Sequence, residues 1–252
     1  MLIRLYCKLF CAAALFIGLP GKASSQSTPV NFTGWYGYEG YHPFVEGRPW
    51  GFFAEGYLKR NHIITDRMQE FIRLGINYTL PNGNRITGGL AYQYTVPYDE
   101  VSEPYSWPDY RIWEQYLIRK KMPKGMWQHR FRMEQRWLGR KDNPDKEGFD
   151  EYKFENTFRY LLKKSFIFNE KLYGVLQDEI HLRMPPPELE KIFDQNRIYA
   201  GIGYNLDKNK WWRIETGYML QTSFKSSVDA VGRRRINNVF RITITSDAPF
   251  KK

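Results

Sequence analysis

The chain has 252 residues, 42% of them hydrophobic and 17% aromatic, and a formal net charge of +11. Its mean hydropathy is −0.60. This value argues against a bundle of transmembrane helices, but not against a membrane barrel whose lumen and loops are polar. No internal repeat or low-complexity linker divides the chain, so we predict one folded domain.

Residues 1–26 have the pattern of a secretory signal peptide. Basic residues precede an apolar run of eleven residues, 9–19, and a small polar stretch follows at 23–26. A membrane anchor would need about 20 apolar residues. Both cysteines, Cys7 and Cys11, lie in this segment. After cleavage the mature chain would therefore have no thiol and no disulfide, and the loss of three basic residues would lower its net charge from +11 to +8.

Beyond this segment, apolar and polar residues alternate in stretches of roughly 10–13 residues. A strand that crosses an outer membrane needs about 9–11 residues and shows every second side chain to lipid. The alternation predicts ten strands, at 50–58, 68–80, 86–96, 111–121, 126–137, 152–163, 171–184, 195–206, 211–221 and 238–245. We therefore predict an all-β fold, a transmembrane antiparallel up-and-down β-barrel of ten to twelve strands, formed by residues 27–252 and located in a bacterial outer membrane.

The connections between these strands alternate short with long. Turn residues at 81–84, 123–125 and 207–209 suit tight hairpins, whereas the connections at 98–110, 138–149, 185–194 and 223–235 are long and polar. Short turns in the periplasm and long loops outside would place the C-terminus in the periplasm.

The segment 31–44 resembles an eleventh strand, although bacterial single-chain barrels have even strand numbers. Two interpretations stay open. The barrel has twelve strands, or it has ten and carries 31–44 as a periplasmic or lumenal piece.

Charged side chains gather on one face of the predicted strands. An arginine that faced lipid at mid-depth would cost about 2–4 kcal/mol, so this face must line the lumen. Its predicted charge network consists of Arg130, Arg132, Glu134, Arg136, Glu155, Arg159, Glu179, Arg183, Arg197, Arg213 and Glu215. Arg73, Arg119 and Arg241 share this face. Paired with glutamates, these arginines would fill and rigidify a small lumen. Their excess would alternatively favour anions in a narrow channel.

Two short motifs carry a resemblance to a known family. Asp178-Glu179-Ile180 and the run Asp194-Gln195-Asn196-Arg197 resemble the bacterial domain-of-unknown-function family 2490, as does the Arg-and-Glu strand around Glu134. The resemblance implies an outer-membrane β-barrel without an assigned reaction. Strict alternation places Asp178 on the lipid side, so we expect a bulge near Gln177 or a position near the outer rim.

We expect a non-enzymatic membrane protein, with a barrel-embedded hydrolase of lipid or peptide as the alternative. The hydrolase hypothesis rests on His181, Glu179 and Asp178. The serines Ser223, Ser226 and Ser227 of an outer loop could approach His181, but no motif links a serine to a histidine. We predict no catalytic residues, and neither metal nor cofactor, because metal-ligand spacings and Gly-rich phosphate loops are absent from the sequence.

The expected partners are outer-membrane lipids, with small anionic solutes as further candidates. The basic tract 233–235 in the last long loop would face the phosphates of lipopolysaccharide. We expect no binding to nucleic acid, because an exported protein rarely meets it.

Overall fold

The computed structural model describes residues 30–100, 102–184, 192–224 and 234–251. Within these ranges, no helix is long and apolar enough to span a membrane. The strands are β1 (Val30–Pro43), β2 (Trp50–Asn61), β3 (Asp66–Thr79), β4 (Arg85–Thr95), β5 (Trp107–Met122), β6 (Gly125–Arg140), β7 (Glu151–Ile167), β8 (Leu172–Arg183), β9 (Phe193–Asn205), β10 (Trp212–Phe224) and β11 (Arg234–Ser246).

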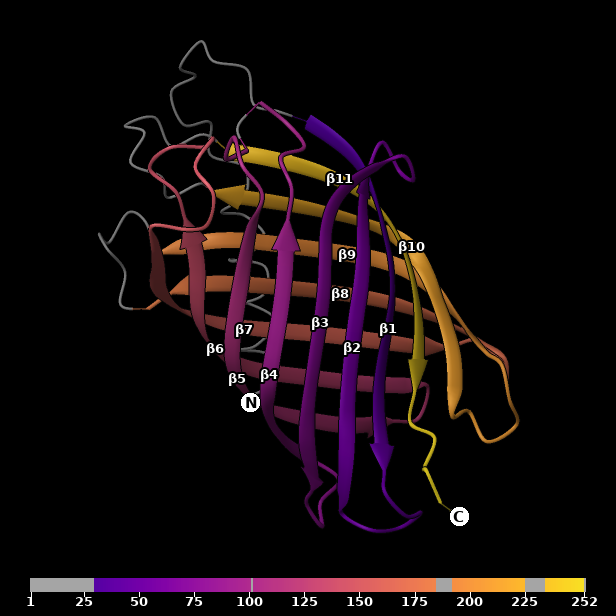
Figure 1. Ribbon diagram of the computed structural model, residues 1–252. Coiled ribbons are helices and arrows are strands. Elements are labelled where there is room, and N and C mark those ends of the chain that lie inside the picture. Colours follow the sequence, from indigo (N-terminus) through magenta and orange to yellow (C-terminus); the bar gives the residue numbers. More distant parts are fainter. Residues whose placement is uncertain (1–29, 101, 185–191, 225–233, 252) are drawn as a thin grey trace.

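These strands close into a barrel in which each is antiparallel to its neighbours in the chain, whereas β1 and β11 pair in parallel (Figure 1). An odd number of up-and-down strands makes the first and the last run in the same direction, so the closing pair must be parallel. For the same reason β1 begins at the end of the barrel that carries the long loops, and the chain ends at the opposite, short-turn end (Figure 1).

The predicted all-β, up-and-down barrel of ten to twelve strands is confirmed, with eleven strands. Both interpretations of 31–44 are wrong. The closed barrel has no twelfth strand among the described residues, and 31–44 is not a periplasmic or lumenal piece, because Thr33 of β1 pairs with Asn61 of β2 and with Val239 of β11. The expectation of an even count failed because it assumed that the closing pair is antiparallel.

The other strands lie where the alternation predicts them, but several are longer. β5 begins at Trp107 instead of residue 111, and β7 continues to Ile167 instead of residue 163. Trp107 pairs with Thr95 of β4, and Ile167 pairs with Tyr173 of β8. In a closed sheet a strand continues as long as its neighbours supply hydrogen-bond partners, so these ends are set by the adjacent strands.

The three predicted tight turns all connect strands at the short-turn end. β6 follows β5 after only two residues and begins at Gly125, whose φ is +151°. A Cβ atom at Gly125 would lie 1.9 Å from the carbonyl oxygen of Ser165. Only glycine allows this close approach of β6 to β7.

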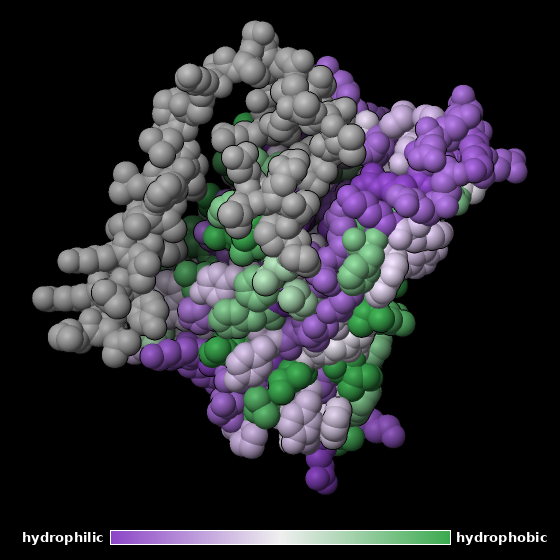
Figure 2. Space-filling view, turned by 90° about the vertical axis from the view of Figure 1, so that its left-hand side faces the viewer, coloured by the Kyte–Doolittle hydropathy of each residue, from purple (hydrophilic) through white to green (hydrophobic). Residues whose placement is uncertain are grey.

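The two faces of the wall differ sharply in polarity. On the outside, large apolar side chains such as Leu90, Ile202 and Ile72 are 65%, 55% and 49% exposed. Figure 2 shows such residues over the middle and lower part of one face, below a hydrophilic upper corner. On the inside, charged side chains lie between two apolar clusters.

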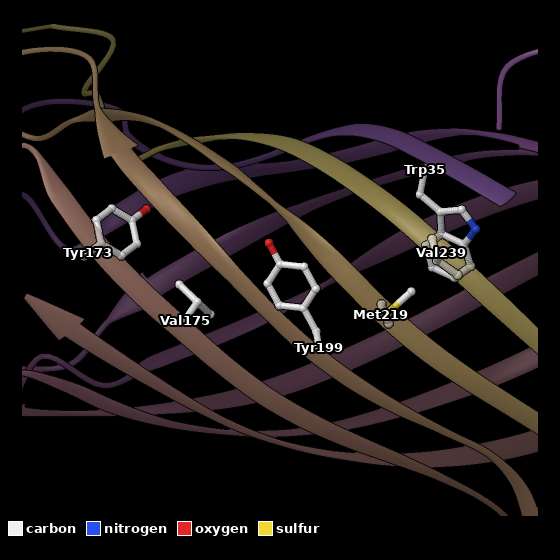
Figure 3. Close-up of a cluster of buried hydrophobic side chains, with 6 residues drawn as sticks. All are labelled: Trp35, Tyr173, Val175, Tyr199, Met219 and Val239. Atoms are coloured by element: carbon white, nitrogen blue, oxygen red, sulfur yellow. The ribbon is translucent and has the colours of Figure 1, made fainter. Parts of the chain in front are cut away.

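The first cluster consists of Trp35, Tyr173, Val175, Tyr199, Met219 and Val239, which project from β1 and β8–β11 into the barrel (Figure 3). The second consists of Tyr41, Phe53, Ala91, Trp113 and Leu117, on β1, β2, β4 and β5. The barrel interior is therefore filled in large part by aromatic rings.

The parallel closure can be tested by a disulfide across the β1–β11 seam. Thr33 and Val239 are register partners, and both side chains are completely buried on the inner face. We expect Thr33→Cys with Val239→Cys, in a Cys7→Ser, Cys11→Ser background, to form a disulfide that non-reducing gels detect. The control pair, Thr33→Cys with Phe240→Cys, should stay reduced because Phe240 faces outward. Crosslinking of the control pair alone would contradict the register.

Candidate functional site

The inner wall carries a network of ion pairs whose first centre is Glu134 on β6. Glu134 accepts hydrogen bonds from Arg111 at 2.9 Å, from Arg159 at 2.7 Å and from Arg73. Glu134 and Arg73 are almost completely buried. The three arginines come from β3, β5 and β7 because period-two alternation turns each of them inward. One carboxylate therefore joins four strands across the lumen.

A second centre is Glu179 on β8. Arg130 and Arg159 each donate to Glu179 Oε1 at 2.8 Å, and Arg197 lies 3.5 Å from Oε2. His181 Nε2 lies 3.3 Å from Oε2. Arg159 binds both Glu134 and Glu179, so the two centres form one continuous network.

Arg132 lies next to this network but has a different kind of partner. Its guanidinium donates to Gln115 Oε1 at 2.6 and 3.0 Å and lies 5.2 Å from the ring centre of Trp113. Glu55 is 3.6 Å away. A neutral amide and an aromatic face therefore provide much of the environment of this buried cation.

Other members of the predicted network pair with residues other than Glu134 and Glu179. Arg136 pairs with Asp109 at 2.6 Å, and Glu215 accepts from Lys163 at 2.8 Å. Glu155 lies 3.1 Å from Lys153 instead of an arginine. Arg183 pairs with Asp194 at the long-loop end, and Arg213 pairs with Asp247 at the short-turn end.

The residues of the family motif are divided between the two faces of the wall. Gln195 faces inward, and its amide lies 2.8 Å from His181 Nδ1. Asp178 faces outward and accepts from Asn196 Nδ2 at 2.7 Å. The expected bulge near Gln177 is absent, because the register of β8 shifts only between His181 and Leu182. The side-chain amide of Asn196 therefore provides the hydrogen bond that stabilises the outward-facing carboxylate of Asp178.

Several inner residues escaped the sequence analysis because they lie at or beyond predicted strand ends. Lys59 follows the predicted end at 58, Asp109 precedes the predicted start at 111, and Asp247 follows the predicted end at 245. Glu55 lies inside a predicted strand, and strict alternation from Phe53 would have found it.

Asp247 connects opposite walls at the short-turn end. Its carboxylate accepts from Arg85 of β4 and from Arg213 of β10, each at 2.8 Å, and lies 3.6 Å from Arg119 of β5. Burial acts to raise the pKa of Asp247, but these three arginines outweigh it and hold the pKa well below its usual range. The carboxylate therefore stays ionised at neutral and mildly acidic pH.

At the long-loop end, the β4–β5 connection is bound to the closing seam. Asp99 accepts from Arg235 Nη2 at 2.7 Å and from Asn31 Nδ2 at 2.9 Å. The adjacent Tyr98 lies against Arg235, and burial raises its pKa to about 12, with Arg235 acting in the opposite direction. Arg235, one of the basic residues expected to face lipid phosphates, is thus occupied within the protein. Arg233 lies outside the described residues.

Two cavities lie inside the barrel. A central one of about 110 Å³ is lined by nine basic and four acidic residues. A larger one of about 660 Å³ at the long-loop end, here called the vestibule, is lined by ten basic and six acidic residues. Five residues line both cavities: Lys59, Gln93, Arg111, Arg159 and Arg197. Where the two meet, four of five lining side chains are cationic.

Nothing in the described geometry assembles the expected elements of a hydrolase. Within these residues, no serine hydroxyl hydrogen-bonds a histidine ring, and His181 instead contacts Glu179 and Gln195. Ser226 and Ser227 lie outside the described ranges. In the same part of the chain, no group of three or more His, Cys, Asp or Glu residues could hold a metal ion.

Removing the charge of Glu134 should destabilise the barrel. Glu134→Gln leaves Arg73, Arg111 and Arg159 without their common carboxylate, and breaking a buried ion pair costs about 3–5 kcal/mol. The control is Glu155→Gln, which affects only a partly exposed pair with Lys153, for which we expect less than about 1 kcal/mol. The free energy of unfolding in urea measures both. Equal losses would contradict the central role of Glu134.

The comparisons with known proteins point to one family. No curated protein and no solved structure gives a significant match. The model of a family described as "Protein of unknown function (DUF2490)" matches residues 32–231, which include most of β1 and all of β2 to β10. This match confirms the resemblance carried by the motifs around Asp178 and Asn196. The chain therefore belongs to the DUF2490 family.

Proposed function

We propose that the protein is a bacterial outer-membrane barrel that provides a narrow, anion-preferring path through its lumen. The observation that carries the proposal is the polarity of the wall: charged residues, with basic ones in excess, lie inside, and large apolar residues lie outside. A water-soluble barrel would have the opposite arrangement, with polar residues outside and apolar residues inside. The signal-peptide pattern of residues 1–26 agrees with export.

The outer surface supports contact with lipid. Its strands have 11 to 17 residues, long enough for a tilted crossing of the hydrocarbon. Trp50 and Trp212 are 55% and 40% exposed and begin β2 and β10 at the short-turn end. Aromatic residues at strand ends are typical of the membrane interface. Lys146 and Lys153, exposed at the long-loop end, are the candidates we propose for contact with lipopolysaccharide phosphates.

The two cavities support passage of small solutes. The central cavity, at about 110 Å³, is well above the roughly 10–15 Å³ that a cavity needs to hold one water, so it has room for several waters. Beside this cavity, the buried side chains of Trp113, Arg73 and Glu134 fill part of the cross-section of the lumen. The path is therefore narrow, and its basic excess gives the lumen a positive potential that favours anions. At its short-turn end, Asp247 with its three arginines reaches across the opening.

Membrane insertion can be tested by fractionation and gel mobility. We expect the protein to remain in the outer-membrane fraction after urea washing, because the exposed apolar wall is stable only against lipid. We also expect unboiled samples to migrate differently from boiled ones, because a closed barrel resists detergent unfolding. Recovery in the soluble fraction, with identical mobility before and after boiling, would overturn the membrane assignment.

The anion path can be tested in planar bilayers. The reversal potential in a chloride gradient should indicate anion preference, and Asp247→Asn should raise the unitary conductance because the bridge to Arg85 and Arg213 weakens. Asp145→Asn, the same change in an exposed loop, is the control and should leave conductance unchanged. Lowering the pH from 7 to 5 should not reproduce the effect, because Asp247 stays ionised. Cation preference, or no conductance in any variant, would contradict the proposal.

A further inference from the structure

Two cations at the junction of the two cavities, Lys59 and Arg197, have little compensating negative charge within the described part of the protein. Lys59 Nζ and Arg197 lie 4.0 and 5.0 Å from the ring centre of the same residue, Trp35. Arg111 and Arg159 line the same junction, but each has two carboxylate partners: Arg111 binds Asp109 at 2.5 Å and Glu134 at 2.9 Å, and Arg159 binds Glu134 and Glu179. Like charges gathered in a buried space repel one another, and each loses hydration, so such an arrangement is costly unless an anion is present.

Lys59 and Arg197 have too few acidic partners for their charge. Among the described residues, Lys59 has no carboxylate within ion-pair distance, and Nζ donates to the neutral Gln69 Oε1 at 2.7 Å. Arg197 has only Glu179, at 3.5 Å, and that carboxylate already accepts shorter bonds from Arg130 and Arg159. The remaining lining residue, Gln93, is neutral and accepts from Arg111.

Unused donors also point to a ligand at the junction. The Nε atoms of Arg111 and Arg197 are buried without a hydrogen-bond partner. An ammonium group has three donors, and Lys59 uses one of them on Gln69. Buried donors are nearly always satisfied in folded proteins, so several unsatisfied donors on neighbouring cations indicate an acceptor that the chain does not supply.

From these contacts we infer a binding site for a phosphate-like oxyanion, formed by Lys59, Arg111 and Arg197 where the central cavity meets the vestibule. Guanidinium groups bind the several oxygens of an oxyanion with directed hydrogen bonds, whereas a halide offers no such geometry. The ligand is free phosphate, or the phosphate group of a larger solute whose remainder occupies the vestibule. This inference rests on the proposed anion path for how the ligand reaches the site.

The experiment is isothermal titration of the detergent-purified full barrel with inorganic phosphate at constant ionic strength in sodium chloride. We expect saturable binding of one phosphate per chain. Lys59→Gln should weaken it by about 10- to 100-fold, the usual effect of losing a charge-assisted hydrogen bond. Lys59→Arg should largely retain it, and Lys208→Gln, which removes an exposed cation in the turn between β9 and β10, should leave it unchanged. A shift in gel mobility on boiling, equal to that of the wild type, shows that each variant is folded.

Three outcomes decide the inference. The absence of saturable phosphate binding, or equal affinity in Lys59→Gln and the wild type, overturns it. Tighter binding of glycerol phosphate than of inorganic phosphate supports it and identifies the larger solute as the source. Titration does not depend on conductance. Phosphate binding by a barrel that does not conduct would therefore support the binding site and contradict the proposed anion path. Anion conductance without phosphate binding overturns the site and leaves the path standing.

Discussion

The parallel pairing of β1 with β11 is the contact on which the rest of the structure depends. An open sheet of the same strands would leave two edges with unpaired backbone groups, and both of its faces would meet the same solvent. Closure gives every strand two partners and separates an inner face from an outer one. The charged network, the cavities and the apolar outer wall all follow from that separation. Because the number of strands is odd, the first strand begins at one opening of the barrel and the last strand ends at the other.

Inside the barrel, buried charged residues share partners in a network instead of forming separate ion pairs. Glu134 serves three arginines, and Arg159 binds two carboxylates. Buried ion pairs are often no more stabilising than apolar packing of the same volume. The stability of the barrel must therefore come mainly from the closed ladder of backbone hydrogen bonds and from the aromatic clusters. The network contributes something else, a fixed positive field along the lumen.

Alternation predicts the fold well because it is a property of each strand by itself. The inward position of Glu134 and the outward position of Ile202 could both be derived from their neighbours in sequence. Strand ends are set by partners on other strands, and this is why Lys59, Asp109 and Asp247 were missed. The partner of each charge depends on register. Glu155 faces Arg136 across β6 and β7, yet it pairs with Lys153, because Asp109 already holds Arg136.

The distribution of charge distinguishes a lumen that conducts from one that side chains fill only for rigidity. A lumen filled only for rigidity would place a carboxylate near every buried cation, as happens around Glu134, where Arg111 and Arg159 lie within 2.9 Å. This balance fails for the neighbouring Lys59, which has an amide and an aromatic ring in place of an acid. The two cavities meet at that level. A mobile anion would restore neutrality there, whereas in a sealed plug the same cations would remain uncompensated. The imbalance therefore supports the proposed anion path.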